Sequence, residues 1–266
     1  MLSRPSLYRL FLGALALFLS MTGYAAETAL PPSVKALQSQ GLDVMGEFNV
    51  GDGLRAFAGA AGDRPLAIYV TQDGSAIIGT RVGPDGKALD EGRLQDLVAK
   101  PMAKRAWSAL EKATWVQDGK KDAPRIIYTF SDPNCPYCHK FWEASRPWVK
   151  SGAVQLRHLV VAVIRPDSAT KAATILGAKD RSAELTKNEM TFSEGGIKPA
   201  ESVPPAIQTI LDENQELMMN MGFRGTPGIV AMRSDGLLEK INGLPQPAAL
   251  AELLGPNPGS PSAKTK

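Results

Sequence analysis

The feature that most constrains this chain is its cysteine pair, the only two cysteines in 266 residues, which stands between an expected strand and an expected helix. Segment 125–130 is apolar and β-branched, which is typical of a buried strand. Turn-forming residues follow at 131–134, and apolar side chains then recur at helical spacing over 141–149. The pair, Cys135-Pro136-Tyr137-Cys138, therefore lies where the helix begins.

A helix N-terminus is a position that favours thiolate over thiol, because its N–H groups are free and the helix dipole attracts negative charge. Cysteines in such places have pKa values lowered to about 3.5–7.5 from about 8.5. Pro136 suits the first helical turn, where its missing N–H would have no partner. The pattern predicts a redox-active dithiol.

Three other interpretations of the cysteine pair remain open. A structural zinc site needs four ligands, and a structural disulfide across so short a loop would stabilise the fold little. Cys135 to His139 also matches the C-x-x-C-H signature of c-type haem attachment, although such motifs normally lie in small helical domains. For zinc, the histidines that could add ligands are His139 and His158. For haem, His139 would be one axial ligand, and the candidates for the opposite one are Met218, Met219 and Met221.

The N-terminal segment has the features of an export signal. Arg4 and Arg9 are basic, residues 10–19 are apolar, and Gly23-Tyr24-Ala25 fits a cleavage site. The apolar run is short for a membrane span, so an uncleaved anchor is the weaker alternative. We expect a cleaved signal peptide at 1–25 and a periplasmic protein. Two cysteines are too few for a disulfide scaffold, which again indicates chemistry.

The charge of the chain gives no reason to expect a polyanionic partner. The formal net charge is +3, and the predicted signal peptide carries two of the arginines and no acids. The mature chain is therefore nearly neutral, which argues against nucleic acid or an anionic membrane surface as partner. About 240 mature residues are enough for two domains.

The first part of the chain predicts a small antiparallel sheet with one helix. Residues 32–40 favour a helix that ends at Gly41, and strand-like runs follow at 42–50, 54–58, 66–71 and 76–81. Asp-Gly pairs between these runs are hairpin signals. From Asp90 to Trp115 the pattern is helical, and Pro101 is expected to start a second helix. Residues 116–124 are polar and turn-rich.

The rest of the chain predicts an α/β layered domain. After the helix that follows the dithiol, Gly152 ends the helix and a buried strand is expected at 155–164. Residues 168–222 are mostly helical in pattern. A hairpin at 228–232 and 237–241 and a last helix at 247–254 complete the domain.

These residues together resemble a known family. Strand-Cys-Pro-Tyr-Cys-helix, with Gly225-Thr226-Pro227 before a hairpin, resembles a thioredoxin fold, in which that proline is cis and packs against the active-site disulfide. The whole arrangement resembles the DsbC/DsbG group of periplasmic disulfide isomerases. Segments 119–124, 132–138, 146–149 and 154–157 are similar to the G type, and the C type has glycine in place of Pro136. His139 stands where the G type usually has lysine.

The resemblance implies an α/β fold in which a small α+β (cystatin-like) dimerisation domain and a helical linker precede a thioredoxin-like domain with a helical insertion. The expected segments are a signal peptide at 1–25, the dimerisation domain at 26–88, the linker at 89–118, the catalytic domain at 119–255 with its insertion at 168–222, and a disordered tail at 256–266.

The resemblance also implies roles for single residues. Cys135 would be the exposed attacking thiolate and Cys138 the more buried resolving thiol. The groove residues would be Pro136, Tyr137, Thr226 and Pro227. No cofactor and no metal are expected beyond the redox-active disulfide Cys135–Cys138.

The implied function is that of a homodimeric thiol-disulfide oxidoreductase kept reduced by a membrane reductase of the DsbD type. It would reduce sulfenic acids or reshuffle non-native disulfides in protein clients. A dithiol oxidase that donates disulfides is the alternative within thiol chemistry. A non-catalytic chaperone and a c-type haem electron carrier are alternatives from other classes.

Overall fold

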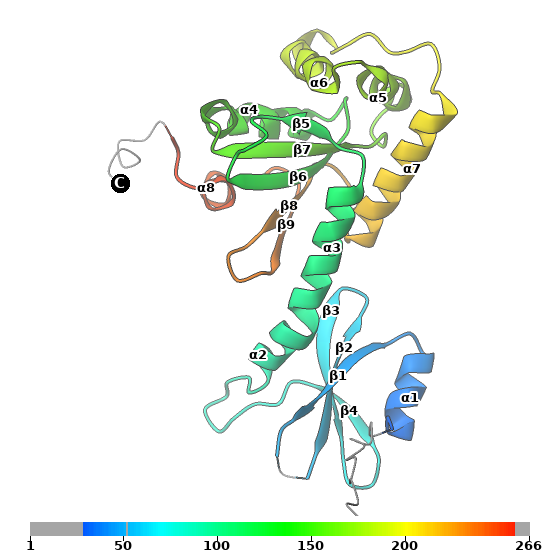
Figure 1. The fold of residues 1–266 in the computed structure, drawn as a ribbon, viewed down its shortest axis with the longest axis vertical. Coiled ribbons are helices and arrows are strands. Elements are labelled where there is room, and N and C mark those ends of the chain that lie inside the picture. Colours follow the sequence, from blue (N-terminus) through cyan, green and yellow to red (C-terminus); the bar gives the residue numbers. More distant parts are fainter. Residues whose placement is uncertain (1–28, 52, 259–266) are drawn as a thin grey trace, which may run out of the picture.

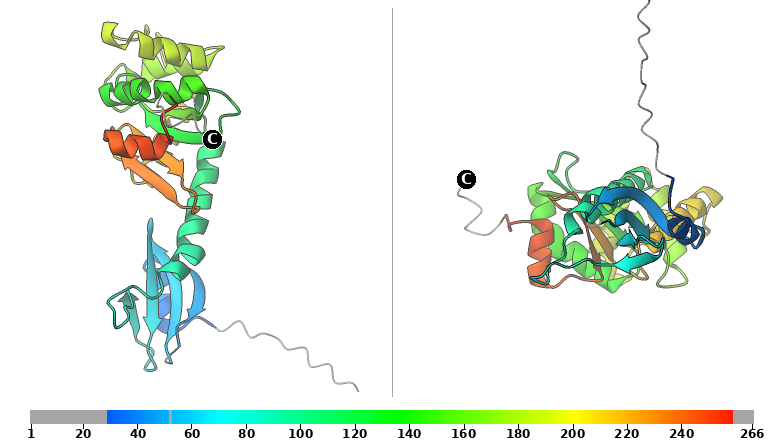
Figure 2. Two further views of the ribbon diagram at one scale, coloured as in Figure 1. Left: turned by 90° about the vertical axis from the view of Figure 1, so that its left-hand side faces the viewer. Right: turned by 90° about the horizontal axis from the view of Figure 1, so that it is seen from below.

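The computed structural model describes residues 29–51 and 53–258 of the chain. The predicted signal peptide at 1–25 and residues 259–266 of the predicted tail lie outside the described residues. The molecule is elongated, with a small sheet at one end, a larger sheet at the other, and a long helix between them (Figure 1 and Figure 2). Within the described residues, no helix combines the length and the apolar character needed to cross a membrane.

The small body is a four-stranded antiparallel sheet in the order β1-β2-β3-β4. One face packs against α1 through a cluster that includes Val34 and Ile68. The other face packs against the start of the long helix through a cluster that includes Tyr69 and Val98. The elements are α1 (Pro32–Ser39), β1 (Asp43–Asn49), β2 (Arg55–Ala61), β3 (Arg64–Val70) and β4 (Ala76–Gly79).

Strand β2 is longer than the sequence pattern predicts, because it continues past residue 58 to Ala61. Its last residues are small and weakly strand-forming, yet Gly59 and Ala60 pair with Leu66 and Pro65 of β3. Pairing with a neighbouring strand outweighs the low local propensity here.

The connecting helix is continuous through three labelled segments: α2 (Glu91–Leu94), the π-helical η1 (Gln95–Ala99) and α3 (Lys100–Lys112). The expected fresh start at Pro101 is therefore wrong, since Leu94, Gln95, Ala99 and Lys100 all have right-handed helical backbone angles. The wider π-helical turn just before Pro101 makes room for its ring against the preceding turn, so the helix runs on.

The large body is a five-stranded mixed sheet in the order β5-β7-β6-β8-β9. Side chains alternate along the central strand: Ile127 joins a cluster with α4 and α8, whereas Tyr128 and Phe130 join one with α3 and α7. The sheet is thus covered on both faces (Figure 1). The elements are β5 (Val116–Asp118), β6 (Arg125–Ser131), α4 (Pro136–Ser151), β7 (Val154–Val160), β8 (Gly228–Met232), β9 (Leu238–Asn242) and α8 (Pro247–Leu254).

Two predicted boundaries differ in this body. Segment 116–118, expected as part of the linker and a polar turn, is the edge strand β5, and its buried Val116 pairs with His158. The strand expected at 155–164 ends at Val160. The backbone N–H groups of Val163 and Ile164 instead donate to the carboxylate of Asp132, which turns the chain away from the sheet.

The helical insertion has a core of its own at the β5 and β7 edge of the sheet. Its cluster joins residues such as Leu176, Leu185 and Leu211 to Val116 and Val160 of the strands. The insertion consists of α5 (Ser168–Gly177), α6 (Arg181–Met190), the short 3-10 helix η2 (Phe192–Glu194) and α7 (Pro205–Asn220). Figure 1 shows α5 and α6 at the end of the molecule farthest from the small sheet.

Two contacts connect distant parts of the chain. The indole N–H of Trp148 donates to the carbonyls of Gly255 and Pro256, which holds the first residue of the predicted disordered tail against α4. The Asp63 carboxylate, in the β2–β3 turn, lies 2.9 Å from the ammonium of Lys240 in β9 and joins the two bodies.

Candidate active site

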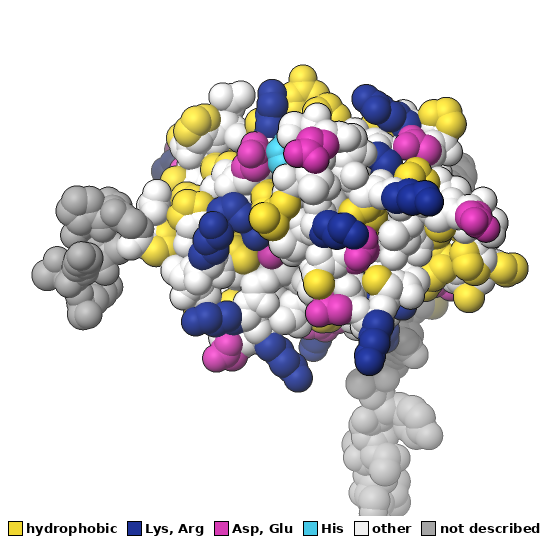
Figure 3. All heavy atoms as spheres, turned by 90° about the horizontal axis from the view of Figure 1, so that it is seen from above, with side chains coloured by type: hydrophobic (Ala, Val, Ile, Leu, Met, Phe, Trp, Pro, Cys, Tyr) yellow, Lys and Arg dark blue, Asp and Glu magenta, His cyan; other side chains and the backbone are white. Residues whose placement is uncertain are grey.

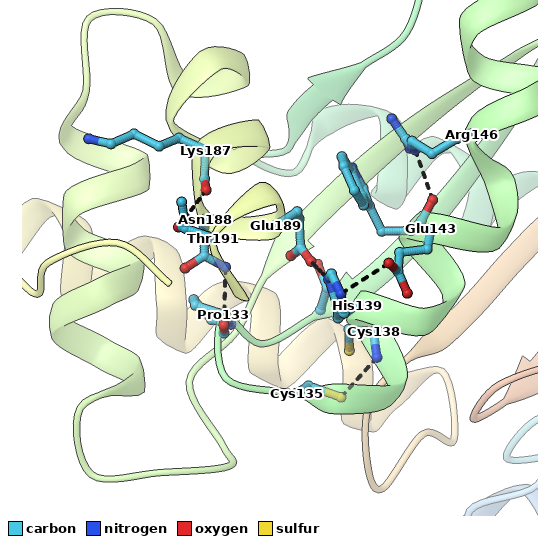
Figure 4. A network of polar contacts seen from close by, with 12 residues as sticks. Pro133, Cys135, Cys138, His139, Glu143, Arg146, Lys187, Asn188, Glu189 and Thr191 are labelled. Carbon is cyan, nitrogen blue, oxygen red and sulfur yellow. Dashed lines mark hydrogen bonds and ion pairs between the residues drawn. The ribbon is translucent and has the colours of Figure 1, made fainter. Parts of the chain in front are cut away.

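The cysteine pair lies at the N-terminus of α4, as the sequence predicts. Cys135 is the N-cap residue, with extended backbone angles, and Pro136 occupies the first helical turn. The backbone N–H of Cys138 donates to the Cys135 sulfur at 3.2 Å, and in its thiol form that sulfur donates to the Thr226 carbonyl at 3.4 Å. Strand β6 ends just before this turn, so the central strand of the sheet positions the dithiol. Figure 4 shows both cysteines at the start of the helix.

The surroundings of the two thiols shift their pKa values in opposite directions. The hydrogen bond with the Cys138 side chain is the main cause that lowers the pKa of Cys135 from 9.0 to about 6, against the effect of burial. The Thr226 hydroxyl and the backbone N–H groups of Cys138 and Tyr137 lower it further. Burial, and then the hydrogen bond with Cys135, raise the pKa of Cys138 well above its ordinary value. At neutral pH the arrangement therefore holds one thiolate and one thiol.

The expectation that Cys135 is exposed is wrong for this structure. Cys135 is 2% exposed and Cys138 is 5% exposed, so both residues are buried. The sulfur of Cys135 faces the backbone of Thr226, which accounts for its low exposure. What distinguishes the two sulfurs is the balance of causes: hydrogen bonds dominate at Cys135 and lower its pKa, whereas burial dominates at Cys138 and raises its pKa.

The other predicted groove residues surround the dithiol in two ways. Pro136 and Tyr137 are exposed, and 56% of Tyr137 is accessible, so they form an outward-facing rim. Thr226 contacts Cys135 through its carbonyl, and the Thr226-Pro227 peptide is cis. Pro227 is buried, and its carbonyl accepts from the Gly243 N–H. The Thr226 hydroxyl is buried, lowers the pKa of both cysteines, and is otherwise without a hydrogen-bond partner among the described residues.

His139 makes contacts that do not support the haem alternative. Its Nδ1 lies 2.9 Å from Glu189 Oε2 of α6, and its Nε2 lies 3.5 Å from Glu143 Oε1. Its ring stacks on Phe192 with centroids 4.4 Å apart. Figure 4 shows the imidazole between the two carboxylates.

The methionines considered as axial ligands are not placed to pair with His139. Met218 and Met221 pack in the cluster on the α3 and α7 face of the sheet, whereas α4 packs on the other face. Met219 is partly exposed at the junction of the two bodies. Within 29–51 and 53–258, no group of three or more His, Cys, Asp or Glu side chains is arranged to hold a metal ion.

A buried polar cluster beside α4 was not predicted from the sequence. Arg146 forms two hydrogen bonds with the Asp118 carboxylate, and His158 bridges Ser131 Oγ at 3.2 Å and Asp118 Oδ2 at 3.4 Å. Burial acts to raise the pKa of Asp118, but hydrogen bonds from His158 and Arg146 outweigh it and hold that pKa well below its usual range. The cluster ties the strands β5, β6 and β7 to α4.

Comparison with known proteins agrees with this geometry. A family model described as a thioredoxin-like domain matches residues 113–256. With a dithiol between a central strand and a helix, the protein is a thioredoxin-fold thiol-disulfide oxidoreductase, and the predicted α/β fold with a thioredoxin-like domain is confirmed. The dimerising role of the small domain stays a prediction.

Two relatives then specify the family. The thiol:disulfide interchange protein DsbG of Pseudomonas aeruginosa is 41% identical over 87% of this chain and 91% of its own length. The protein of the same name from Escherichia coli K12 is 37% identical over 85% of this chain and 92% of its own length. The chain belongs to the DsbG family of thiol:disulfide interchange proteins, which confirms the predicted family. Among solved structures, Helicobacter pylori DsbG matches 74% of this chain and 98% of its own, with 19% identity and a TM-score of 0.40.

Proposed function

We propose that the protein is a periplasmic thiol-disulfide oxidoreductase, kept reduced, that acts on protein clients as a sulfenic-acid reductase and a disulfide isomerase. Cys135 is the attacking thiolate and Cys138 the resolving thiol. The observation that carries this proposal is the position of Cys135 as the N-cap of α4, where the Cys138 N–H donates to its sulfur at 3.2 Å. The pKa values agree with it, since that of Cys135 is lowered to about 6 and that of Cys138 is raised well above the ordinary value. Thiolates are the reactive species in exchange, so Cys135 reacts first.

The reductase reaction consumes two electrons from the dithiol. The Cys135 thiolate attacks the sulfur of a client sulfenic acid, forming a mixed disulfide while hydroxide leaves and is protonated to water. Cys138 then loses its proton and attacks the Cys135 sulfur. That step releases the client thiolate and leaves a Cys135–Cys138 disulfide. A membrane reductase of the DsbD type would return two electrons and two protons.

Isomerisation uses the same first step without net oxidation. The Cys135 thiolate attacks a non-native client disulfide, and the freed client thiolate then attacks another client disulfide or the mixed disulfide itself. When the client regains a disulfide in this way, Cys135 is released as a thiolate. The redox state of the protein is then unchanged.

The surface near the dithiol supports clients that are proteins. Tyr137, Val163 and Ile164 are exposed large apolar side chains, and Val163 and Ile164 are bonded through their backbone to Asp132 of the loop before Cys135. Acidic and basic side chains are interspersed on the face of Figure 3, which suits varied proteins better than a polyanion.

A homodimer through the small sheet is part of the proposal. Strand β4 is an edge strand, and β3 is its only partner in the sheet as described. The exposed apolar side chains Ile77 and Ile78 lie on it, with Val82 and Leu89 just beyond. An exposed apolar edge of this kind is a ready site for pairing with a second copy about a two-fold axis.

The test uses the purified reduced protein and a single-cysteine client carrying a sulfenic acid. The parent protein should reduce the client sulfenic acid to a thiol, and Cys135→Ala should leave it unreduced. Cys138→Ala should accumulate a mixed disulfide through position 135, seen on a non-reducing gel. Adducts through position 138 would reverse the assignment of the two cysteines. Alkylation at harvest, followed by gel analysis, should show the dithiol reduced in cells. A mostly oxidised pair would favour the oxidase alternative.

A further inference from the structure

Lys171 is a buried lysine that the chemistry described above does not use. It lies on α5 with 6% of the residue exposed. Its ammonium donates to Asn134 Oδ1 at 2.7 Å and to the Gly195 carbonyl at 2.5 Å, and it lies 3.7 Å from the Asp167 carboxylate. Burying a charge costs free energy that an apolar side chain would not incur. A role beyond packing is therefore expected for this lysine.

Asn188 of α6 makes a second connection of the same design. Its side-chain N–H₂ donates to the Pro133 carbonyl at 3.1 Å, and its carbonyl oxygen accepts from the Ile197 N–H at 3.2 Å. Figure 4 shows the contact with Pro133 beside the dithiol. The turn at 195–197 approaches closely, since a Cβ on Gly196 would lie 2.5 Å from Asn188 Oδ1. Lys171 and Asn188 each hold this turn at one end and the loop before Cys135 at the other.

At the dithiol end, Asn134 has both side-chain groups engaged. Besides accepting from Lys171, it donates to Asp167 Oδ1 at 3.0 Å and to Ser168 Oγ at 3.1 Å. Its own backbone N–H donates to Asp132 Oδ1 at 2.8 Å. Asn134 immediately precedes Cys135, the N-cap of α4. The position of the N-cap is therefore set by α5 through the Asn134 side chain.

We propose that Lys171 is a positioning residue, which fixes the Cys135 end of α4 through Asn134 and places a positive charge beside the loop before Cys135. This inference rests on the proposed role of Cys135 as the attacking thiolate. The Cys138 N–H lies 3.2 Å from the Cys135 sulfur, and such a bond weakens quickly when its geometry is lost. The insertion thus acts on the chemistry as well as on the shape of the groove.

The experiment compares the full-length reduced protein with Lys171→Met, which removes the charge but keeps an unbranched apolar side chain. Ultraviolet thiolate absorbance is followed against pH. We expect the apparent pKa of Cys135 to rise by about one unit, which is the scale on which lost hydrogen bonds and charges move such values. Lys187→Met is the matched control, because Lys187 lies on α6 with 65% of its side chain exposed. It should leave the titration unchanged.

A purely structural role would lower the thermal midpoint of Lys171→Met and leave the Cys135 titration in place, and that result would overturn the inference. If Lys171→Met does not fold, Asn134→Ser tests the same link from the other end. It should raise the Cys135 pKa, and an unchanged titration would again overturn the inference. Where both variants fold, their effects should be non-additive, because the contact between Lys171 and Asn134 is lost in both. If instead the parent thiolate titrates near the ordinary cysteine value, the proposed function fails as well.

Discussion

The Cys135 thiolate links the stability of the reduced protein to pH. Its pKa is lowered on folding from 9.0 to about 6. The folded state therefore gains stability from the thiolate, fully at and above about pH 9, and loses this gain as the pH falls through 6. Urea unfolding should give a larger free energy of unfolding for the reduced protein than for Cys135→Ser at pH 9. This difference in free energy should shrink as the pH falls from 9 to below 6. A difference independent of pH would contradict this linkage.

Thr226 is the residue whose side chain bears most directly on both sulfurs from outside the cysteine motif. Its hydroxyl lowers the pKa of Cys135 and of Cys138 and is otherwise without a partner among the described residues. Thr226→Val replaces that hydroxyl with a methyl group of similar volume. We expect a higher Cys135 pKa in a thiolate titration, slower client turnover, and an unchanged fold by circular dichroism. An unchanged titration with unchanged kinetics would remove this role.

At the residue scale, the sequence predicted the dithiol and its neighbours well because they are contiguous or carry strong local chemistry. Cys135, Cys138 and Thr226 come together as expected. Lys171, Asn188 and Glu189 gave no signal, since charged and amide side chains on helices are usually solvated. Only the three-dimensional packing of α5 and α6 onto the loop before Cys135 buries them.

Strand β4 is the element that governs assembly in the proposed dimer. Ile77 on this edge is 55% exposed, and each interface formed about a two-fold axis would bury it twice. Ile77→Lys should weaken the dimer about 100-fold or more, because burying one such side chain is worth about 1.5–3 kcal/mol. Sedimentation velocity over a dilution series measures this. Val163→Lys, also at an exposed apolar position, is the control and should leave the dimer intact.

At the element scale, hydrophobic periodicity predicted most helices and strands, and the misses have physical reasons. Strand β5 is too short and polar to stand out, and it exists because Val116 and its neighbours pair with β7. The helix through Pro101 continues because a π-helical turn accommodates the ring. Gly152, with φ of 84°, ends α4 as expected, since that backbone conformation favours glycine.

For the whole molecule, the long helix belongs to both bodies. Val98 is buried against the small sheet, and Leu110 is buried in the core of the large one. A fragment that starts at Lys100 should therefore fold as a monomer. One that starts at Gly119 lacks Leu110 and β5 and should unfold or melt far lower, because each large buried side chain contributes about 2–5 kcal/mol. Thermal unfolding and sedimentation of the two fragments test this. Equal melting temperatures would show that the large body does not need the helix for its stability.

The continuity of that helix gives its length a geometric meaning. Inserting one residue between Val98 and Leu110 would move the large body by about 1.5 Å along the helix axis and turn it by about 100° around that axis. The direction in which the dithiol faces, relative to the small sheet, is therefore set by the number of residues in the helix. Changes in length would redirect the chemistry, while substitutions on its exposed side would not.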